Sequence, residues 1–484
     1  MDNQAEGNRR TKIVATIGPA SWDEATLRAL IRAGMDVARI NFSHGEHASH
    51  AEIIARVRKI AEEEKRVVAI LCDLQGPKIR IGKLAKPLLL VNGDTVTLTV
   101  DEADGTNNLV HLPHPEIIPD IGAGKRLLLD DGNLEFKVDS ASERALVCTV
   151  VYGGLLESRK GVMAPDTDLT LAAITDKDRA DITFALSQNA DYIALSFVRF
   201  AEDIEELRQI MQAGGGNLAV IAKIEKHEAL EHLEEIVGAC DGVMVARGDL
   251  GLEIPVEEVP YYQKRIITLC NAAAKPVIVA TQMLSSMVES ARPTRAEASD
   301  VYNAIVDGTD AVMLSNETTV GEYPVESVRT MATIASFADR DILRKHPARR
   351  MLGGDIHADV CQESISNAIS EAVYHISELL NLRAILTMTL TGYTARLVAR
   401  ERPHTPILCV TPNEVTYRRM ALVWGVNPLL VPRLDTIDEM IGAVSEVAVS
   451  EGVVDKGDTV VIVMGVPFYV GGQTNMLKIH RVEE

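Results

Sequence analysis

The sequence has few cysteines, no long apolar run and a shortage of basic residues, and each shortage excludes a class of protein. No stretch approaches the ~18 apolar residues of a membrane helix, and the polar residues 1–10 are not followed by the apolar segment of a signal peptide. The six cysteines lie far apart, without the paired spacing of a zinc site. They are Cys72, Cys148, Cys240, Cys270, Cys361 and Cys409. We therefore expect buried thiols in a reducing compartment, a cytoplasmic protein and no membrane partner.

Basic residues are also scarce, because 49 Lys and Arg stand against 69 Asp and Glu in a chain with a formal net charge of −20. Such a surface repels polyphosphate backbones, which excludes nucleic acid as a partner. An anionic small substrate requires local cations and bound metal at its site. Apolar residues make up 46% of the 484 residues and are spread along the chain, so roughly three domains of ~150 residues are expected.

Short apolar, β-branched runs alternate with longer helical patterns through much of the chain. There are eight such runs: Lys12–Ile17, Val37–Asn41, Val67–Asp73, Tyr192–Phe197, Leu218–Glu225, Gly242–Ala246, Pro276–Thr281 and Ala311–Ser315. Eight strand and helix units predict an α/β fold with a closed (β/α)8 TIM barrel, whose chemistry lies at the carboxyl ends of the strands. On the strand count alone, an open doubly wound sheet stays an alternative.

Two other patterns divide the chain into domains. From about Gly76 to Lys160, short alternating strands with Gly and Asp between them predict a small, barrel-like β domain that acts as a lid over the catalytic mouth. After a charged connector at Arg344–Gly354, a new alternation predicts an open α/β domain. The expected domains are the discontinuous barrel at 1–75 and 161–343, the inserted lid at 76–160 and the C-terminal regulatory domain at 344–484.

Polar side chains follow the second and third predicted strands. Arg39, Asn41 and Ser43 alternate along the second strand and share one face, where they suit a phosphoryl group. A polar strand end is the alternative interpretation, and it does not explain an arginine flanked by apolar residues. The third strand is followed by a carboxylate, an ammonium and a guanidinium, at Asp73, Lys78 and Arg80. For any single one of these charges, a solvated hinge is the simpler interpretation.

The fifth and sixth strands carry the most specific pattern. Lys223 and Glu225 project the same way after an apolar run, and Asp249 follows the neighbouring strand. A structural ion pair is the alternative interpretation of the first two. Two carboxylates from neighbouring strands can hold one Mg²⁺ that keeps open positions for substrate oxygens. The N–H groups of Gly248 and Asp249 can donate to a substrate carboxylate, and the Thr281 hydroxyl faces the same centre.

Seven strings of residues resemble the pyruvate kinase family and occur in its order across nearly the full chain. They are VARINFSHG, CDLQGPKIR, KIE, MVARGDLG, ATQML, RPTRAE and GGQTNMLKIHRV. The resemblance implies a barrel with a lid inserted after the third strand and a C-terminal α/β domain. It implies Mg²⁺-dependent phosphoryl transfer from phosphoenolpyruvate to ADP, which gives pyruvate and ATP in the final step of glycolysis, and it implies a homotetramer.

The resemblance also assigns roles to residues. Glu225 and Asp249 resemble the ligands of Mg²⁺ or Mn²⁺, Lys223 resembles the cation that stabilises the transferred phosphoryl group, and Arg39 resembles the phosphate-contacting arginine. Nucleotide contacts are implied at Arg80, Lys160, His44 and Asp130. The group that receives the substrate carboxylate is implied at Gly248, Asp249 and Thr281. Catalytic roles are implied at Lys223, Arg39, Thr281 and Arg80, with Thr281 delivering a proton to the enolate.

Several positions depart from the family pattern. Many members have a glutamate in place of Lys78 and bind K⁺ in a pocket that matches Asn41, Ser43, Asp73 and the carbonyl of Leu74. The combination Leu74, Gln75, Lys78 and Ile81 resembles the subgroup that works without a monovalent cation, so our hypothesis is that the Lys78 ammonium replaces K⁺. The strings KGVMAPD and SNETTVG stand where members usually have KGVNLPG and SGETAKG, which puts the hinge after the lid and nearby supporting contacts in doubt.

A loop in the C-terminal domain is a candidate effector site. Hydroxyls and free N–H groups at a helix N-terminus favour an anion, and the matching family loop binds a phosphorylated effector. An ordinary capped turn is the alternative. The loop residues are Thr387, Thr389, Thr391, Gly392, Tyr393 and Thr394. We expect a sugar phosphate or a nucleotide as the effector.

Two other functions compete with this interpretation. A phosphoenolpyruvate-type barrel lyase or mutase also holds Mg²⁺ on carboxylates at strand ends, but it needs neither a lid nor the nucleotide contacts of Arg80 and Lys160. A catalytically silent metabolite sensor is the second alternative. It would be expected to lack one of Lys223, Glu225 and Asp249, and all three are present.

Overall fold

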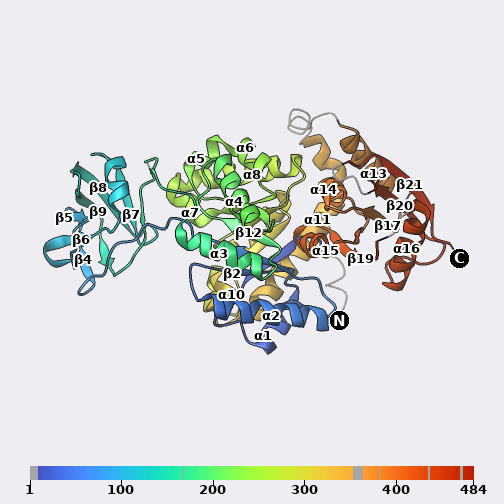
Figure 1. The fold of residues 1–484 in the computed structure, drawn as a ribbon, viewed down its shortest axis with the longest axis horizontal. Coiled ribbons are helices and arrows are strands. Elements are labelled where there is room, and N and C mark those ends of the chain that lie inside the picture. Colours follow the sequence, from blue (N-terminus) through green and yellow to red (C-terminus); the bar gives the residue numbers. More distant parts are fainter. Residues whose placement is uncertain are drawn as a thin grey trace.

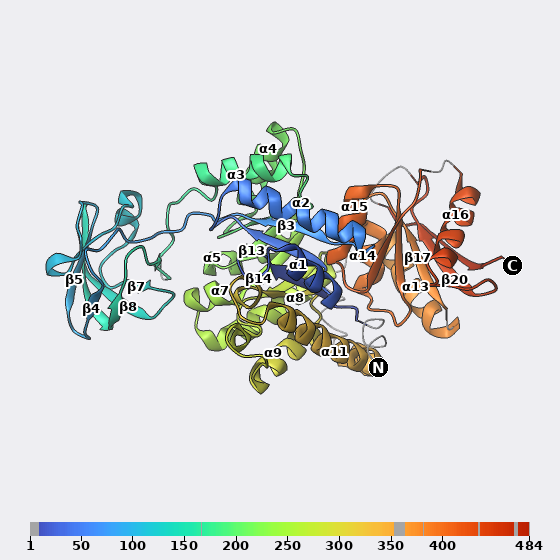
Figure 2. The same ribbon diagram turned by 90° about the horizontal axis from the view of Figure 1, so that it is seen from below.

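The computed structural model describes residues 9–165, 167–352, 364–380, 382–433, 436–468 and 473–483. Three bodies lie in a row along its long axis, as Figures 1 and 2 show from two sides. A small β domain occupies one end, a barrel the middle and a second α/β domain the other end. In these ranges, every helix is too short or too polar to cross a bilayer.

The central body is a closed barrel of parallel strands, in the order β1-β16-β15-β14-β13-β12-β3-β2. The strands are β1 (Lys12–Thr16), β2 (Val37–Asn41), β3 (Ala69–Asp73), β12 (Tyr192–Leu195), β13 (Ala219–Ile224), β14 (Gly242–Ala246), β15 (Val277–Ala280) and β16 (Ala311–Leu314). Because β1 pairs with both β2 and β16, the open-sheet alternative is wrong. All eight predicted strands are present, and they are mostly apolar because helices cover the outside of the barrel.

Helices on the outside of the barrel begin and end where the sequence provides caps. In α1 (Glu24–Ala33), the Asp23 side chain accepts a hydrogen bond from the N–H of Thr26, and Gly34 ends the helix at a φ of +114°. The other helices are α2 (His47–Glu63), α3 (Asp176–Ser187), α4 (Ala201–Ala213), α5 (His227–Glu231), α6 (Leu233–Ala239), α7 (Arg247–Glu253), α8 (Val259–Ala272), α9 (Arg295–Val306), α10 (Asn316–Thr319) and α11 (Pro324–Leu352). Short 3₁₀ turns lie at η4 (Val256–Glu258) and η5 (Ser285–Val288).

The β domain is inserted between β3 and α3, as the sequence pattern predicts. Its larger sheet has the order β11-β7-β8-β9-β5-β6, and β4 pairs with β10. The predicted strands are β5 (Thr95–Thr99), β7 (Arg126–Leu129), β8 (Leu134–Ala141) and β9 (Ala145–Tyr152). The sequence did not reveal β4 (Leu88–Leu90), β6 (Leu109–His111), β10 (Gly154–Leu156), β11 (Val162–Met163) and the 3₁₀ turns η2 (Thr106–Asn108) and η3 (Pro115–Asp120). These strands are too short to display an alternating pattern.

The third body is an open sheet with the order β19-β18-β17-β20-β21, in which β21 is antiparallel. Its elements are α13 (Ile365–Leu380), β17 (Ala384–Met388), α14 (Tyr393–Arg400), β18 (Ile407–Thr411), α15 (Glu414–Arg419), η6 (Met420–Leu422), β19 (Val426–Leu430), α16 (Ile437–Ser450), β20 (Thr459–Met464) and β21 (Met476–Arg481). The sequence analysis missed β19 and β21. Both carry exposed or partly exposed side chains, so their apolar signal is weak.

The predicted connector at Arg344–Gly354 is helical over most of its length. Helix α11 continues through Arg344 to Leu352, and the rest of the connector lies outside the described residues. Pro347 and the local charges indicated a break, but the alanine, arginine and leucine residues around them are strong helix formers.

The cysteines behave as expected of free thiols in the described part of the chain. Five of them are buried and unpaired, and Cys361 lies outside the described residues. Burial raises the pKa of Cys240 to about 11 and that of Cys148 to about 12. These thiols therefore stay protonated and unreactive near neutral pH.

The third body closes the amino-terminal end of the barrel. Ala421 and Leu422 in η6 pack into one apolar cluster with barrel-interior residues such as Tyr192. The Tyr192 hydroxyl donates a 2.7 Å hydrogen bond to the carbonyl of Arg419, and the Lys12 ammonium donates one of 2.8 Å to the carbonyl of Val426. This end of the barrel is thus filled by protein.

Buried charges at the amino-terminal end are paired across the two bodies. Asp191 is fully buried and forms ion pairs with Arg58 at 2.8 Å and Arg418 at 2.7 Å. Asp339, also fully buried, accepts a 3.1 Å hydrogen bond from the indole N–H of Trp424. The opposite end of the barrel, at the carboxyl ends of the strands, faces the β domain.

Candidate active site

A chain of buried charges crosses the carboxyl ends of β2, β3 and β13. An Nη of Arg39 lies 2.6 Å from Asp73 Oδ2, and Lys223 Nζ lies 3.3 Å from Asp73 Oδ1 and 2.8 Å from Glu225 Oε1. No side chain in this chain of charges is more than 11% exposed. The cations predicted from the sequence are therefore held against carboxylates at one end of the barrel.

Lys223 is fixed in its charged form. Burial opposes the charge, but the carboxylates of Asp73 and Glu225 outweigh it and raise the pKa of Lys223 above its usual value. Its ammonium also donates a 2.7 Å hydrogen bond to the hydroxyl of Ser196, which donates in turn to the carbonyl of Leu74. A held ammonium of this kind can stabilise an anion without reorganising. The sequence analysis gave Ser196 no role.

Glu225 and Asp249 form the candidate pair of metal ligands. Glu225 is 1% exposed, and Asp249 lies in the first turn of α7. Burial raises the pKa of Glu225, Lys223 opposes this, and the like charge of Asp249 raises the pKa further. Two carboxylates close enough to repel one another, next to the carboxyl end of a barrel strand, fit an oxygen-binding divalent cation such as Mg²⁺.

Thr281 and Gly248 meet beside this pair. The Gly248 N–H donates a 2.7 Å hydrogen bond to Thr281 Oγ1, which donates to the carbonyl of Ala280. Thr281 and Gln282 have positive φ angles of +68° and +53°, a strained conformation for residues other than glycine. The residues expected to receive a substrate carboxylate are therefore brought together, but the Gly248 N–H already has a protein partner.

Arg247 supports this strained turn, and the sequence analysis assigned it no role. An Nη donates a 2.9 Å hydrogen bond to the carbonyl of Thr281, and the other Nη forms a 2.7 Å ion pair with Asp300. The side chain is only 12% exposed. The available signal was a charged residue directly after the buried strand β14.

The residues of the predicted monovalent-cation pocket lie at neighbouring strand ends. Asn41 and Asp73 occupy paired positions on β2 and β3, and Asn41 Oδ1 accepts a 3.1 Å hydrogen bond from the Ser43 N–H. Asp73 Oδ1 is buried and accepts no hydrogen bond in the described part of the chain, although Lys223 lies nearby. A buried oxygen of this kind fits a cation. The Leu74 carbonyl is already used by Ser196.

A pocket lies between the β domain and the barrel. Leu128 and Asp131 line it from the β domain, and Phe197 and Asp249 line it from the barrel. Lys78 lines the same pocket. The candidate metal ligand Asp249 thus lines a pocket that both domains form.

Comparison with known proteins decides the family. The family model described as "Pyruvate kinase, barrel domain" matches residues 8–328, and "Pyruvate kinase, alpha/beta domain" matches residues 367–480. The chain belongs to the pyruvate kinase family. It is therefore a phosphotransferase, and the family fold agrees with the barrel, inserted β domain and α/β domain described above.

Individual pyruvate kinases are similar to the chain over nearly its full length. Pyruvate kinase 2 of Synechocystis is 48% identical over 98% of this chain and 80% of its own length. The pyruvate kinase of Corynebacterium glutamicum is 45% identical over 98% of both chains. A crystal structure of a pyruvate kinase from Cryptosporidium parvum aligns with a TM-score of 0.92 at 36% identity, covering 99% of this chain and 97% of that one.

The residues that resemble nucleotide contacts of pyruvate kinases fall into two groups. Asp130 and Lys160 form a 2.7 Å ion pair in the lid, and this hydrogen bond lowers the pKa of Asp130. Arg80 lies beside them, because its backbone pairs with Gly161. His44, by contrast, is an exposed residue on the loop after β2. Three of the four predicted residues, all except His44, therefore lie near one another where the lid meets the barrel.

The predicted effector loop, between β17 and α14, contains mostly satisfied hydroxyls. Thr387 donates to the Leu408 carbonyl at 3.1 Å, Thr389 Oγ1 accepts from the Gly392 N–H at 3.0 Å, and the hydroxyls of Thr394 and Thr474 lie 2.9 Å apart. Of these bonds, only the one from the Gly392 N–H to Thr389 lies within the turn before α14. Thr391 is exposed and Tyr393 half-buried, both in the loop as predicted.

The sequence analysis missed one cation beside this loop. An Nη of Arg396 donates a 3.2 Å hydrogen bond to the carbonyl of Thr391, and burial lowers the pKa of the guanidinium. Arg396 lies in α14, directly after the predicted loop. Arg396 adds a positive charge, which the predicted loop residues do not supply.

Proposed function

We propose that the chain transfers the phosphoryl group of phosphoenolpyruvate to ADP in a reaction that depends on Mg²⁺ or Mn²⁺, giving pyruvate and ATP as the final step of glycolysis. The observation that carries this proposal is the buried chain of Arg39, Asp73, Lys223 and Glu225, with Asp249 beside it. It places fixed positive charge at the end of the barrel where a transferred phosphoryl group needs it.

The protein contributes position and charge rather than covalent chemistry. Lys223 and Arg39 contact the phosphoryl group and offset the negative charge that spreads over its oxygens during transfer. Their own carboxylate partners hold them in place, so they need not move when the substrate binds. A divalent ion held by Glu225 and Asp249 supplies further positive charge to the phosphoryl and substrate oxygens when it is bound.

The second half of the reaction converts the enolate to pyruvate. Thr281 offers a hydroxyl beside Gly248 and Asp249, and this hydroxyl delivers a proton to the methylene carbon of the enolate. In the free enzyme the hydroxyl donates to the Ala280 carbonyl, so substrate binding must turn it away from that partner. The substrate carboxylate binds at Gly248, Asp249 and Thr281, and the strained turn held by Arg247 presents this group.

ADP binds on the side of the lid. Arg80 and Lys160 offer cations to its phosphates, with His44 and Asp130 as further contacts, and the pocket between the lid and the barrel gives it room. ADP must compete with Asp130 for Lys160. The lid closes over the bound nucleotide and excludes water, which protects the phosphoryl group from hydrolysis.

A coupled assay for pyruvate tests this function directly. We expect pyruvate to form from phosphoenolpyruvate only when ADP and Mg²⁺ are both present. Consumption of phosphoenolpyruvate without ADP would instead support the lyase or mutase alternative. Binding of phosphoenolpyruvate without any turnover would support a silent sensor.

The monovalent cation is a second proposal on the same site. Lys78 takes the role of K⁺, which otherwise binds at Asn41, Ser43, Asp73 and the Leu74 carbonyl. Support for a cation at this place comes from the buried Asp73 oxygen that accepts no hydrogen bond in the described ranges, and Lys78 lines the pocket that Asp249 also lines. We expect full activity with tetramethylammonium as the only monovalent cation. A strict need for K⁺ in that assay would contradict the idea.

Regulation, assembly and location follow from the family. We propose a cytoplasmic homotetramer with the domain boundaries given above, activated by a sugar phosphate or nucleotide at the loop of residues 387–394. Arg396 favours an anion there. We expect the Thr391→Ala, Thr394→Ala double variant to lose the activation while keeping the basal rate. A rate profile against a panel of sugar phosphates and nucleotides checks this, and an unchanged response rules the loop out.

A further inference from the structure

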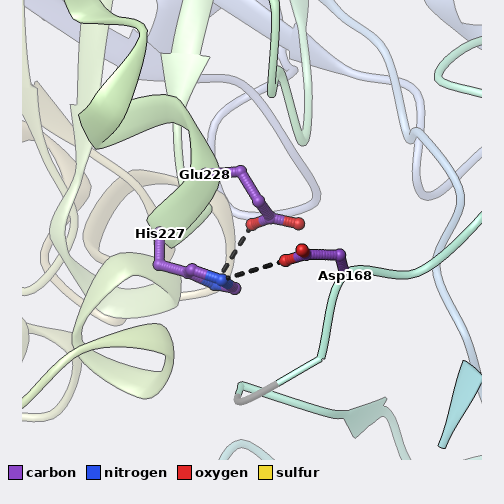
Figure 3. A group of neighbouring side chains, drawn as sticks. All are labelled: Asp168, His227 and Glu228. Carbon is purple, nitrogen blue, oxygen red and sulfur yellow. Dashed lines mark ion pairs between the residues drawn. The ribbon is translucent and has the colours of Figure 1, made fainter.

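Three side chains meet beside the carboxyl end of β13, outside the residues assigned to phosphoryl transfer, as Figure 3 shows. His227 and Glu228 begin α5, whereas Asp168 lies in the return segment, residues 167–175, by which the chain leaves the lid. One ligand atom of each residue lies within 4.8 Å of the other two. The cluster therefore spans the junction between the return segment and the barrel wall.

Glu228 is buried without a hydrogen-bond partner. The residue is 7% exposed, and neither carboxylate oxygen accepts a hydrogen bond within the ranges that the structure describes. His227 Nδ1 lies 3.1 Å from Glu228 Oε2, but its hydrogen bond goes to Glu253 at 3.0 Å. Lys226 Nζ is 3.9 Å from Glu228 and likewise donates to Glu253. The Lys226 ammonium offsets this buried charge from 3.9 Å, and a metal ion bound to the Glu228 oxygens would offset it more closely.

The hydrogen bond of His227 to Glu253 prepares the imidazole as a metal ligand. A carboxylate can only accept, so this contact requires a proton on Nδ1, and a metal ion would then bind at Nε2. Nε2 lies 3.3 Å from Oδ1 of Asp168, and two acceptors at that distance need a cation or a proton between them. An imidazole whose second nitrogen is held by a carboxylate is the usual arrangement around a protein-bound metal.

The charges of the cluster favour a divalent cation. Asp168, Glu228 and Glu253 are carboxylates, and Lys226 is the ammonium that contacts Glu228 and Glu253. A metal-bound imidazole is neutral, so in the metal-bound form three negative charges and one positive charge leave an excess of two negative charges. A divalent ion brings this group to neutrality.

We propose that Asp168, His227 and Glu228 bind a divalent transition-metal ion of the Zn²⁺ class, at a site separate from Glu225 and Asp249. The donor set of one nitrogen and two carboxylate oxygens suits Zn²⁺, whereas Mg²⁺ prefers oxygen ligands alone. Because Asp168 belongs to the return segment and the other ligands to α5, the bound ion fastens this segment to the barrel. It thereby restrains the base of the lid.

The test measures Zn²⁺ binding to the full-length protein in saturating Mg²⁺, which occupies the oxygen-rich site. Competition with a chromophoric chelator gives the affinity, and Co²⁺ as a substitute reports the ligand set through its visible absorption. We expect one Zn²⁺ per chain in the unmodified protein. Asp168→Asn should weaken binding at least about tenfold. Asp168 is suited to replacement because its side chain is 83% exposed.

Two controls make the result decisive. Glu231→Gln changes an exposed carboxylate on the same helix, α5, and should bind Zn²⁺ as the unmodified protein does. Zn²⁺ should also slow proteolysis of the return segment in the unmodified protein but not in Asp168→Asn. Absence of a Zn²⁺ site beside bound Mg²⁺, or equal affinities for Asp168→Asn and Glu231→Gln, would overturn the proposal. Neither readout depends on catalytic activity, so this proposal and the proposed function stand or fall separately.

Discussion

The two ends of the barrel use buried charge in opposite ways. At the amino-terminal end, Asp191 and Asp339 are fully buried and have hydrogen-bonded partners from both the barrel and the third domain. At the carboxyl end, Asp73 and Glu228 carry buried oxygens that accept no hydrogen bond in the described chain. Arg402 at the amino-terminal end has one unpaired nitrogen and is an exception. One end is completed by the protein itself, whereas the other needs ligands to complete it.

Removal of divalent cations should give the largest difference between the two ends of the barrel. We expect EDTA to abolish pyruvate formation, because Glu225 and Asp249 then have no ion between them, and we expect added Mg²⁺ to restore it. In a Trp22→Phe variant, the fluorescence of Trp424, which is buried at the amino-terminal end, should not change. A stable rate in EDTA, or a shift in this fluorescence, would break the comparison.

Replacing a lysine by methionine should lower kcat at the carboxyl end of the barrel but not at the amino-terminal end. Lys223→Met removes a fixed cation from the carboxyl end and should lower kcat about 10³-fold, because the transferred phosphoryl group loses a preorganised charge. Lys12→Met removes a buried lysine from the amino-terminal end, where its ammonium binds the carbonyl of Val426. It should leave kcat unchanged. Steady-state kinetics on both variants, with circular dichroism to confirm folding, measure this, and similar rate losses would argue against it.

Asp191→Asn should act on stability rather than rate. It leaves the guanidinium groups of Arg58 and Arg418 without their buried carboxylate, and we expect the free energy of unfolding to fall by about 3 kcal/mol. Urea denaturation followed by circular dichroism gives this value. Asp300→Asn, which removes the partner of Arg247 at the other end, is the matched variant and should instead lower kcat/KM. Reversed effects of the two variants would contradict the division.

The pH dependence of the free energy of unfolding should reveal the lowered pKa of Lys12. Burial lowers its pKa to about 8, so between pH 8 and its ordinary pKa the unfolded chain binds a proton that the folded chain has released. Stability from this group therefore rises with pH, by about 2 kcal/mol between pH 8 and 9.5. The cysteines titrate equally in the unmodified protein and in Lys12→Met. Their contribution cancels when the free energy of unfolding of Lys12→Met, from urea denaturation, is subtracted from that of the unmodified protein. Identical pH profiles would show that Lys12 is not perturbed.

The sequence predicts those parts that depend on local patterns. Barrel strands such as β14 are apolar from end to end because helices cover them, so each is visible by itself. β21 is not visible, because Lys478 and His480 interrupt its pattern at the edge of a sheet. Lys223 and Glu225 could be placed on one face by their spacing of two residues. The apolar residues that precede them on β13 indicate which way both side chains point.

Contacts between distant segments could not be predicted. Arg247 holds the Thr281 carbonyl only because β15 lies next to β14 in the closed barrel. The ion pair of Asp130 with Lys160 requires the lid to bring two segments together. Neither residue type nor spacing specifies such a partner, since it depends on the complete fold.

The antiparallel bridge between Arg80 and Gly161 means that the chain leaves and re-enters the barrel at almost one point. The inserted β domain is therefore a detour, and a short turn across the bridge would complete the path from β3 to α3. Modules attached in this manner can be lengthened, exchanged or deleted without shifting the register of the strands on either side. The architecture lets the inserted β domain evolve apart from the barrel that carries the Lys223 and Glu225 charges.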